Sequence, residues 1–143
     1  ITTDVIVGFP GETRKQFDNT RKLFRRVRFD LAYIARYSPR PGTVSATTMT
    51  DNVSLEEKKR RERELDEVLK RYALLNNRRY QGQEVEFLVE GIDKKGRYYG
   101  KAGTYQTVVA VPAGRADRKL IGTFSKAKIG KIMPFCLEGQ LVS

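Results

Sequence analysis

Two turns rich in glycine and proline contain the residues best suited to bind an anion. The first, GFPGE at residues 8–12, follows a β-branched run and precedes a helical pattern. Its glycines let the backbone turn tightly, and the amide groups at the start of the following helix can bind an anion. The second, YSPRPGT at residues 37–43, holds Arg40 between two prolines that restrict the backbone and present the guanidinium to a phosphate or carboxylate. Each turn is equally consistent with an ordinary connection that binds nothing.

A third stretch, RYYGKAGTY at residues 97–105, alternates cations with aromatic side chains. The cations can bind phosphates, and the tyrosines can stack on bases or fill a hydrophobic core. Because neighbours on a strand point to opposite faces, we expect one of Tyr98 and Tyr99 to be buried. The candidate RNA contacts in this stretch are Arg97, Tyr98, Lys101 and Tyr105.

The composition excludes several kinds of chemistry. The chain has no histidine and one cysteine, Cys136, so it cannot by itself complete a zinc site or hold an iron–sulfur cluster. A single cysteine excludes an internal disulfide, and no apolar run is long enough to span a bilayer, which favours a cytoplasmic protein with no membrane partner. The formal net charge of +11 favours a nucleic-acid partner, although a basic protein without such a partner would have the same charge.

The elements that position these residues begin with a β/α pattern in residues 1–50. TDVIVGF is typical of a buried parallel strand, and FDLAYIARY predicts a second one. Between them, Thr13 and Gln16 predict a capping box for a helix with Phe17 and Phe24 on its apolar face. Strand, helix and strand at this length indicate a βαβ unit in a parallel sheet or barrel.

A long helix is predicted from about residue 55 to about residue 78. Ser54 and Glu57 predict a capping box at its start. Its apolar stripe is predicted to be Leu65, Val68, Leu69, Tyr72 and Leu75. The mixed charges of EEKKRRERE, at residues 56–64, indicate a solvated face.

Residues 81–143 change to short alternating strands. EVEFLVEGI, a strand after the KKGR turn, TVVAV, GTFSKAKIGKIM and CLEGQLVS predict five strands joined by glycine-rich turns. This pattern indicates a small closed barrel of the OB-like kind. We therefore expect two domains, residues 1–78 and 79–143.

Three of these stretches resemble the radical-SAM methylthiotransferases. They are TTDVIVGFPGET, VRFDLAYIARYSPRPGT and EEKKRRERELDEVL, and YSPRPGT is similar to the tRNA-modifying branch in particular. Residues 79–143 resemble the TRAM domain of that family, a small RNA-binding barrel. The resemblance implies an α/β plus all-β chain: the last β/α units of a radical-SAM, TIM-like barrel, a linking helix and a five-stranded TRAM barrel. Since the chain starts within a strand pattern, we expect it to be the C-terminal part of a longer enzyme.

The resemblance also implies an activity. Such enzymes methylthiolate C2 of a hypermodified adenosine next to the tRNA anticodon, with S-adenosylmethionine and two 4Fe–4S clusters as cofactors. The cysteine ligands of those clusters are not in this chain, so we expect it to be inactive alone and to contribute no catalytic residue. The implied partners are the tRNA anticodon stem-loop and an electron donor such as flavodoxin or ferredoxin.

Residues carry over from the resemblance at four cofactor positions. The family segment near S-adenosylmethionine, written GxIxGxxE, matches Ile6 and Gly8, whereas its acidic residue is displaced here to Glu12. The strand YIARY matches the strand beside the adenine of the cofactor, which adds Arg36 and Tyr37 as candidates. Arg40 is the candidate to contact the cofactor or an RNA phosphate.

Two other functions remain open at this stage. A methylthiotransferase of the same family could act on an aspartate of a ribosomal protein. Alternatively, the chain could be an RNA-binding module without catalysis. The sequence alone does not separate these possibilities.

Overall fold

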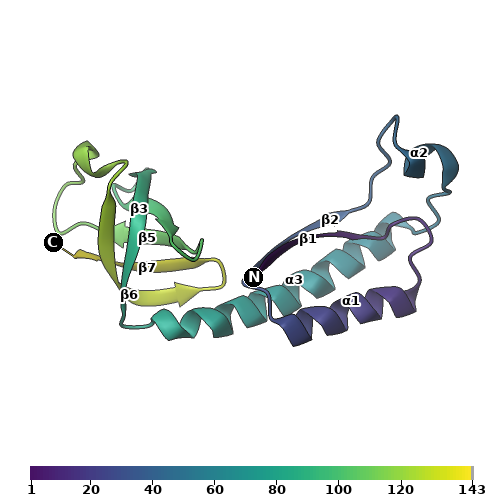
Figure 1. The fold of residues 1–143 in the computed structure, drawn as a ribbon, viewed down its shortest axis with the longest axis horizontal. Helices are drawn as coiled ribbons and strands as arrows, with labels where there is room; N and C mark the ends of the chain where they lie inside the picture. The colour runs from purple at the N-terminus through teal and green to yellow at the C-terminus, as the bar shows by residue number, and fades with distance from the viewer. Residues whose placement is uncertain (143) are drawn as a thin grey trace. The chain divides into compact units, whose positions relative to one another are not determined.

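The computed structural model describes residues 1–142 and divides the chain into two compact units, residues 1–73 and residues 74 onward (Figure 1). Each unit has its own hydrophobic core. The predicted domain boundary, between residues 78 and 79, falls within the 3-10 turn that follows the long helix, whereas the two units divide between residues 73 and 74. Among the described residues, no helix is both long and apolar enough to cross a membrane.

The first unit contains the βαβ unit that the sequence predicted. Its elements are β1 (Thr2–Val7), α1 (Arg14–Val27), β2 (Leu31–Arg36), the short α2 (Val44–Thr48) and most of α3 (Leu55–Asn77). Strands β1 and β2 pair in parallel, from Thr2 opposite Leu31 to Val7 opposite Arg36. The capping box at Thr13 and Gln16 is present, so the start of α1 is as predicted.

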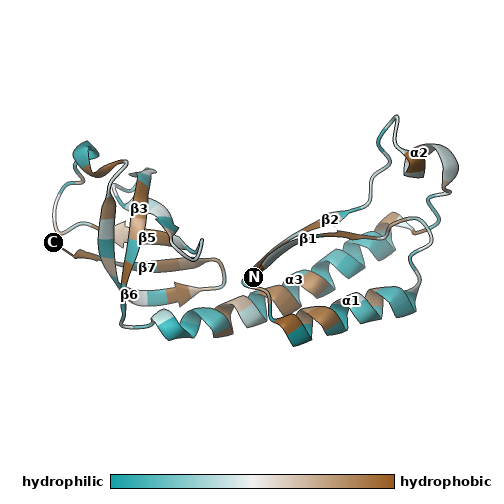
Figure 2. Ribbon diagram, in the orientation of Figure 1, coloured by the Kyte–Doolittle hydropathy of each residue, from teal (hydrophilic) through white to brown (hydrophobic). Residues whose placement is uncertain are grey.

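One face of this small sheet is covered and the other is open. Val7 and Ala32 pack with Phe17, Phe24 and two leucines of α3 in the core of the first unit. On the opposite face Ile6 is 56% exposed and Tyr33 is 70% exposed. Much of the two strands is hydrophobic in Figure 2, although only one face lies against the helices.

Helix α3 confirms the predicted length but not the predicted solvated face. Lys58 and Arg61 are both buried, and they continue the buried stripe that Leu65, Leu69 and Ala73 form. Leu75, predicted to lie in this stripe, is instead exposed. The solvated-face prediction was therefore wrong for these two cations, because each pairs with a residue outside α3: Lys58 with Asp51 in the preceding loop, and Arg61 with Glu12 in the turn after β1.

The second unit is a closed five-stranded barrel, as predicted. Its strands are β3 (Glu84–Ile92), β4 (Tyr98–Ala102), β5 (Thr107–Val111), β6 (Phe124–Met133) and β7 (Cys136–Val142), with 3-10 turns η1 (Arg78–Tyr80) and η2 (Arg118–Leu120). The order around the barrel is β3-β4-β5-β7-β6, and β3 pairs with β6 to close it. Only the β5–β7 pair among these is parallel.

Two glycines allow the strands to approach closely enough for closure. A Cβ on Gly100 would lie 1.7 Å from the carbonyl oxygen of Leu88, and one on Gly139 would lie 2.2 Å from that of Lys128. Any side chain at either position would push neighbouring strands apart. The end of α3 joins this unit through Asn77, whose side-chain nitrogen donates to the carbonyls of Met133 (2.9 Å) and Pro134 (3.1 Å).

Candidate functional site

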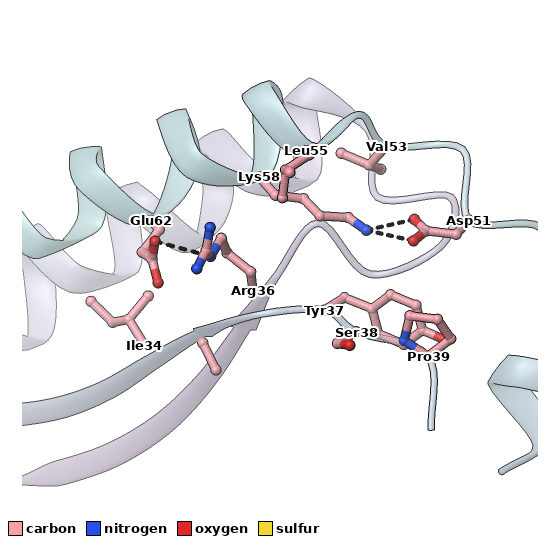
Figure 3. Close-up of a pocket in the computed structure, with 11 residues that line it drawn as sticks. Ile34, Arg36, Tyr37, Ser38, Pro39, Asp51, Val53, Leu55, Lys58 and Glu62 are labelled. Carbon is pink, nitrogen blue, oxygen red and sulfur yellow. Dashed lines mark hydrogen bonds and ion pairs between the residues drawn. The ribbon is translucent and has the colours of Figure 1, made fainter. Parts of the chain in front are cut away.

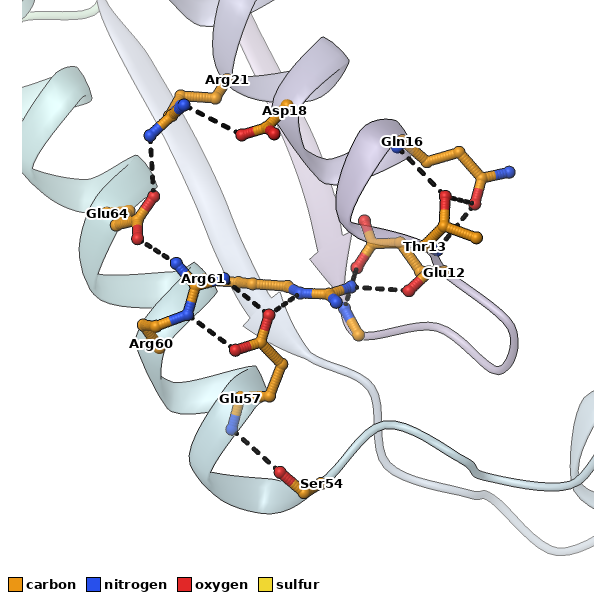
Figure 4. A network of polar contacts seen from close by, with 11 residues as sticks. Glu12, Thr13, Gln16, Asp18, Arg21, Ser54, Glu57, Arg60, Arg61 and Glu64 are labelled. Atoms are coloured by element: carbon orange, nitrogen blue, oxygen red, sulfur yellow. Dashed lines mark hydrogen bonds and ion pairs between the residues drawn. The ribbon is translucent and has the colours of Figure 1, made fainter.

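The turn at residues 8–12 is closed by its own glutamate (Figure 4). Glu12 Oε2 accepts hydrogen bonds from the Gly8 amide at 2.6 Å and from Arg61 Nη1 at 2.5 Å. The Gly11 amide donates to Asn52 Oδ1 at 2.7 Å. The Gly8 and Gly11 amides are therefore already bound by side chains. The amides predicted to bind an anion are those at the start of α1, and of these the Gln16 amide donates to Thr13 Oγ1 at 3.3 Å.

Arg61 connects this turn to α3. Its side chain is 5% exposed, and its Nε donates to Glu57 Oε1 at 2.8 Å. Hydrogen bonds from Arg60 and, to a smaller extent, Arg61 lower the pKa of Glu57 to about 2. The predicted capping box is consequently only half formed: Ser54 Oγ accepts the Glu57 amide at 3.2 Å, but the carboxylate binds the two arginines instead.

A pocket of about 640 Å³ lies between the end of β2 and the start of α3 (Figure 3). Its charges are neutralised in pairs: Lys58 Nζ lies 2.6 Å from Asp51 Oδ2, and Arg36 Nε lies 3.3 Å from Glu62 Oε2. Lys58 Nζ also lies 5.2 Å from the centre of the Tyr37 ring. The four charged residues that line the pocket therefore pair with one another across its walls.

The four cofactor candidates do not share one surface. Arg36 and Tyr37 line the pocket beside α3, whereas Ile6 lies on the open face of the sheet. Gly8 is the first residue after β1 and adopts a left-handed conformation with φ of 68°. A Cβ there would lie 2.3 Å from Lys58 Cγ, so glycine is required by both conformation and packing.

Arg40 lies in an exposed turn that its own neighbours hold. Thr43 Oγ1 donates to the Arg40 carbonyl at 2.8 Å, and the Thr43 amide donates to the same oxygen at 3.2 Å. Within residues 1–142 the Arg40 guanidinium has no ion-pair partner. The turn thus presents an uncompensated cation.

On the barrel, Tyr98 must be corrected from a surface position to the core. It is 2% exposed, and its hydroxyl accepts the Asp117 amide at 2.6 Å and lies 3.1 Å from the Asp117 carbonyl. The folded barrel therefore gives RNA no access to its ring. Tyr99 is the exposed member of the pair, at 39%, and it lies over Gly91, where a Cβ would come 2.5 Å from its hydroxyl.

The other barrel candidates differ in how free they are. Arg97 pairs with Asp93 at 2.8 Å and with Glu138 at 3.3 Å. Lys101 is exposed, and within residues 1–142 its side chain donates only to Thr107 Oγ1, at 2.8 Å. Tyr105 is 78% exposed, and its φ of 65° is unusual for an aromatic residue.

A second cation–aromatic cluster, which was not predicted from the sequence, follows the end of α3. The Arg79 guanidinium lies 4.9 Å from the centre of the Tyr80 ring, and the Tyr80 hydroxyl lies 3.0 Å from Thr104 Oγ1. The sequence NRRYQ at residues 77–81 already places two arginines beside a tyrosine. We did not predict a binding role for this stretch because its sequence is also typical of the end of a charged helix.

Comparison with known protein families identifies the barrel. Residues 78–142, which include all five strands, match the family model described as TRAM domain. The TRAM domain that the resemblance implied for the end of the chain is thus confirmed.

The whole chain is similar to proteins named tRNA-2-methylthio-N(6)-dimethylallyladenosine synthase. It is 44% identical to that of Bacillus mycoides (strain KBAB4), 43% to that of Bacillus cereus (strain B4264) and 41% to that of Bacillus cytotoxicus, in each case over 99% of this chain. The chain spans 27% of the length of each of these relatives. The predicted relationship to the methylthiotransferases, and to their tRNA-modifying branch, is confirmed.

Proposed function

We propose that this chain is the C-terminal part of a radical-SAM enzyme that methylthiolates C2 of a hypermodified adenosine next to the tRNA anticodon. The observation that carries the proposal is the 44% identity to a protein named as such a tRNA synthase, which runs over 99% of the chain. Both units are therefore included in the similarity. A chance likeness of two unrelated domains would not extend through both in the same order.

In this proposal the first unit forms the cofactor-side rim. Helices cover one face of its sheet and the other face, with Ile6 on it, is open, as in strands of a β/α barrel whose helix-free face points into the barrel. Active sites of parallel α/β barrels lie at the carboxyl ends of the strands, where Gly8 follows β1. Ile6 and the backbone at Gly8 fit a contact with S-adenosylmethionine. Arg36 and Tyr37 stabilise this end of the sheet against α3 rather than contact the cofactor. Arg36 forms an ion pair with Glu62, and Lys58 lies over the Tyr37 ring.

S-adenosylmethionine, together with two 4Fe–4S clusters bound by cysteines outside this chain, supplies the radical and group-transfer chemistry when bound. The residues present here have three tasks: they shape the cofactor side, exclude water from it and hold the RNA. An electron donor such as flavodoxin or ferredoxin, and a cytoplasmic location, complete the proposal.

The second unit binds the tRNA anticodon stem-loop. The net charge of +11 favours a polyanion, and exposed Lys101 offers a cation to its phosphates. Arg40, in the first unit, offers a separate cation to the RNA. Arg97 adds positive charge on the same barrel as Lys101, although it pairs with two carboxylates, those of Asp93 and Glu138. Exposed Tyr105 offers a ring to a base, and Tyr99 takes the stacking role first assigned to Tyr98.

Deletion of the gene tests the proposal through the modified nucleosides of bulk tRNA. Mass spectrometry of digested tRNA should show that 2-methylthio-adenosine derivatives disappear, while their precursor without the methylthio group accumulates. Return of the wild-type gene should restore them. Unchanged tRNA nucleosides, together with loss of a methylthio group from a ribosomal protein, would instead assign the enzyme to the protein-modifying branch.

A further inference from the structure

A groove of about 500 Å³ opens on the barrel beside the start of β3. Its lining includes Arg79, Tyr80, Gln83, Glu84, Ala102 and Thr104. Its volume falls in the range of about 300–1,000 Å³ that is usual for ligand pockets. The groove lies wholly within the second unit, and none of its lining residues takes part in the cofactor-side rim.

Tyr105 is the next residue after the turn that forms one wall of this groove. The turn is closed by the Tyr105 amide, which donates to the Ala102 carbonyl at 2.8 Å, and by the Ala102 amide, which donates to Gln106 at 3.0 Å. The contact between Tyr80 and Thr104 fixes the turn to the opposite wall. A bulky residue with positive φ is strained, and such strain concentrates at functional positions. No core packing accounts for this ring, because 78% of the residue is exposed.

The charge at the groove suits a phosphate. Arg78 and Arg79 are exposed, and neither has an ion-pair partner among the described residues. Two acids, Glu84 and Glu86, also line the groove, and each lies opposite a lysine, Lys128 and Lys126, in the β3–β6 register. Opposite charges at facing positions of neighbouring strands attract each other, which reduces the repulsion that the two acids exert on a phosphate. The Tyr80 ring holds the Arg79 guanidinium in place beside the groove.

We propose that this groove binds one unpaired nucleotide of RNA, with Tyr105 stacked on its base and Arg79 bound to its phosphate. Polar groups of Gln83 and Thr104 line the groove where the edge of the base would lie. A base inside a duplex is already stacked on both faces, so the groove selects single strands, loops and bulges. The inference rests on the proposed RNA-binding function and adds a site and a strand preference to it.

The test measures binding of the full chain to a short fluorescein-labelled oligouridine and to a blunt RNA duplex of the same length, by fluorescence anisotropy. Tyr105→Asn removes the ring but tolerates the left-handed backbone, and Tyr105→Phe keeps the ring. We expect Tyr105→Asn to weaken oligouridine binding by about tenfold, the loss of one base–aromatic stack. Tyr105→Phe should bind within about twofold of the wild type because its ring still stacks.

The phosphate contact has its own matched pair. Arg79→Gln and Lys94→Gln each remove one exposed cation, but Lys94 follows the far end of β3 from the groove. Arg79→Gln should weaken oligouridine binding and lower the slope of log affinity against log salt by about 0.7, whereas Lys94→Gln should leave both unchanged. Melting temperatures of all four variants should match the wild type, since every substituted side chain is exposed.

The outcomes separate this inference from the function on which it rests. Tight oligouridine binding that Tyr105→Asn and Arg79→Gln leave unchanged would overturn the groove and keep the RNA-binding function. Equal affinity for duplex and single strand would overturn the strand preference. A wild-type chain that binds neither RNA would remove the RNA-binding proposal itself.

Discussion

Replacement of Glu12 tests whether the buried ion pair with Arg61 holds the first unit together. Glu12 accepts hydrogen bonds from the Gly8 amide and from Arg61. Glu12→Ala therefore removes one of the carboxylates that pair with the Arg61 guanidinium, whose side chain is only 5% exposed. Removal of one partner from a buried pair costs about 3–5 kcal/mol. Because Glu57 still binds Arg61, we expect the lower end of that range for Glu12→Ala.

Glu12→Gln should lower the free energy of unfolding by less, and the geometry of the two hydrogen bonds gives the expected size. Both hydrogen bonds end on the same oxygen, Oε2, so a glutamine carbonyl oxygen in its place can accept both. Only the charge is lost, and a charge-assisted bond is stronger than a neutral one by about 1 kcal/mol. We therefore expect Glu12→Gln to lower the free energy of unfolding by about 2 kcal/mol.

Urea unfolding followed by the helical circular dichroism signal is the suitable assay. Helix α1 and most of α3 lie in the first unit, whereas the second unit is built from strands, so this signal reports the first unit. Asp66→Asn is the matched control, because Asp66 pairs with Lys70 on the exposed surface of α3 and should cost less than about 0.5 kcal/mol. If Glu12→Ala were no more destabilising than Asp66→Asn, the reasoning from burial would be refuted.

Two further predictions concern charge and backbone packing. The pKa of Glu57 falls from 4.5 to about 2 in the folded chain, so its carboxylate stabilises the fold above pH 4.5, and this contribution is lost as the pH falls toward 2. Thermal melts of the first unit should show a weaker pH dependence in that window for Glu57→Gln than for the wild type, and identical slopes would contradict the assignment. Gly100→Ala places a Cβ 1.7 Å from the Leu88 carbonyl and should destabilise the barrel by about 1–3 kcal/mol or more, measured by amide exchange in β3 and β4. Gly114→Ala, whose Cβ would meet nothing within 4 Å, is its control, and equal effects of the two would show that strand contact is not the cause.

Much of the fold was predictable because the signals are local. Alternation of Val85, Phe87 and Val89 identified β3, and the Thr13–Gln16 box identified the start of α1. Both depend only on residues close in the sequence. The predicted end of α3, at about residue 78, differs from the observed end, Asn77, by a single position.

The failures involve contacts with residues outside the element in which the pattern lies. Lys58 and Arg61 were predicted to be solvated because their partners, Asp51 and Glu12, lie outside the helix. Alternation required that Tyr98 or Tyr99 be buried but did not say which. The burial pattern of β4 decides this, since Tyr98 shares its face with the buried Gly100 and Ala102.

The sequence predicted where the candidate residues lie along the strands, but it did not predict which groups they contact. The turn at residues 8–12 lies at the end of β1 as expected, yet its amides are occupied by side chains of its own unit. Arg36 lies at the end of β2 as expected, yet it faces α3 and binds Glu62. The direction of a side chain at a strand end depends on which face the helices cover, and spacing alone does not determine that.

The order of strands around the barrel has a consequence for how the chain is made. Strand β7 lies between β5 and β6, so the ring of hydrogen bonds is complete only when residues 136–142 are in place. During synthesis the preceding four strands emerge from the ribosome first and must wait with open edges, which are prone to pair with other chains. The segment Cys136–Val142 thus completes the barrel, and until it emerges the edges of β5 and β6 stay open to pairing with other chains.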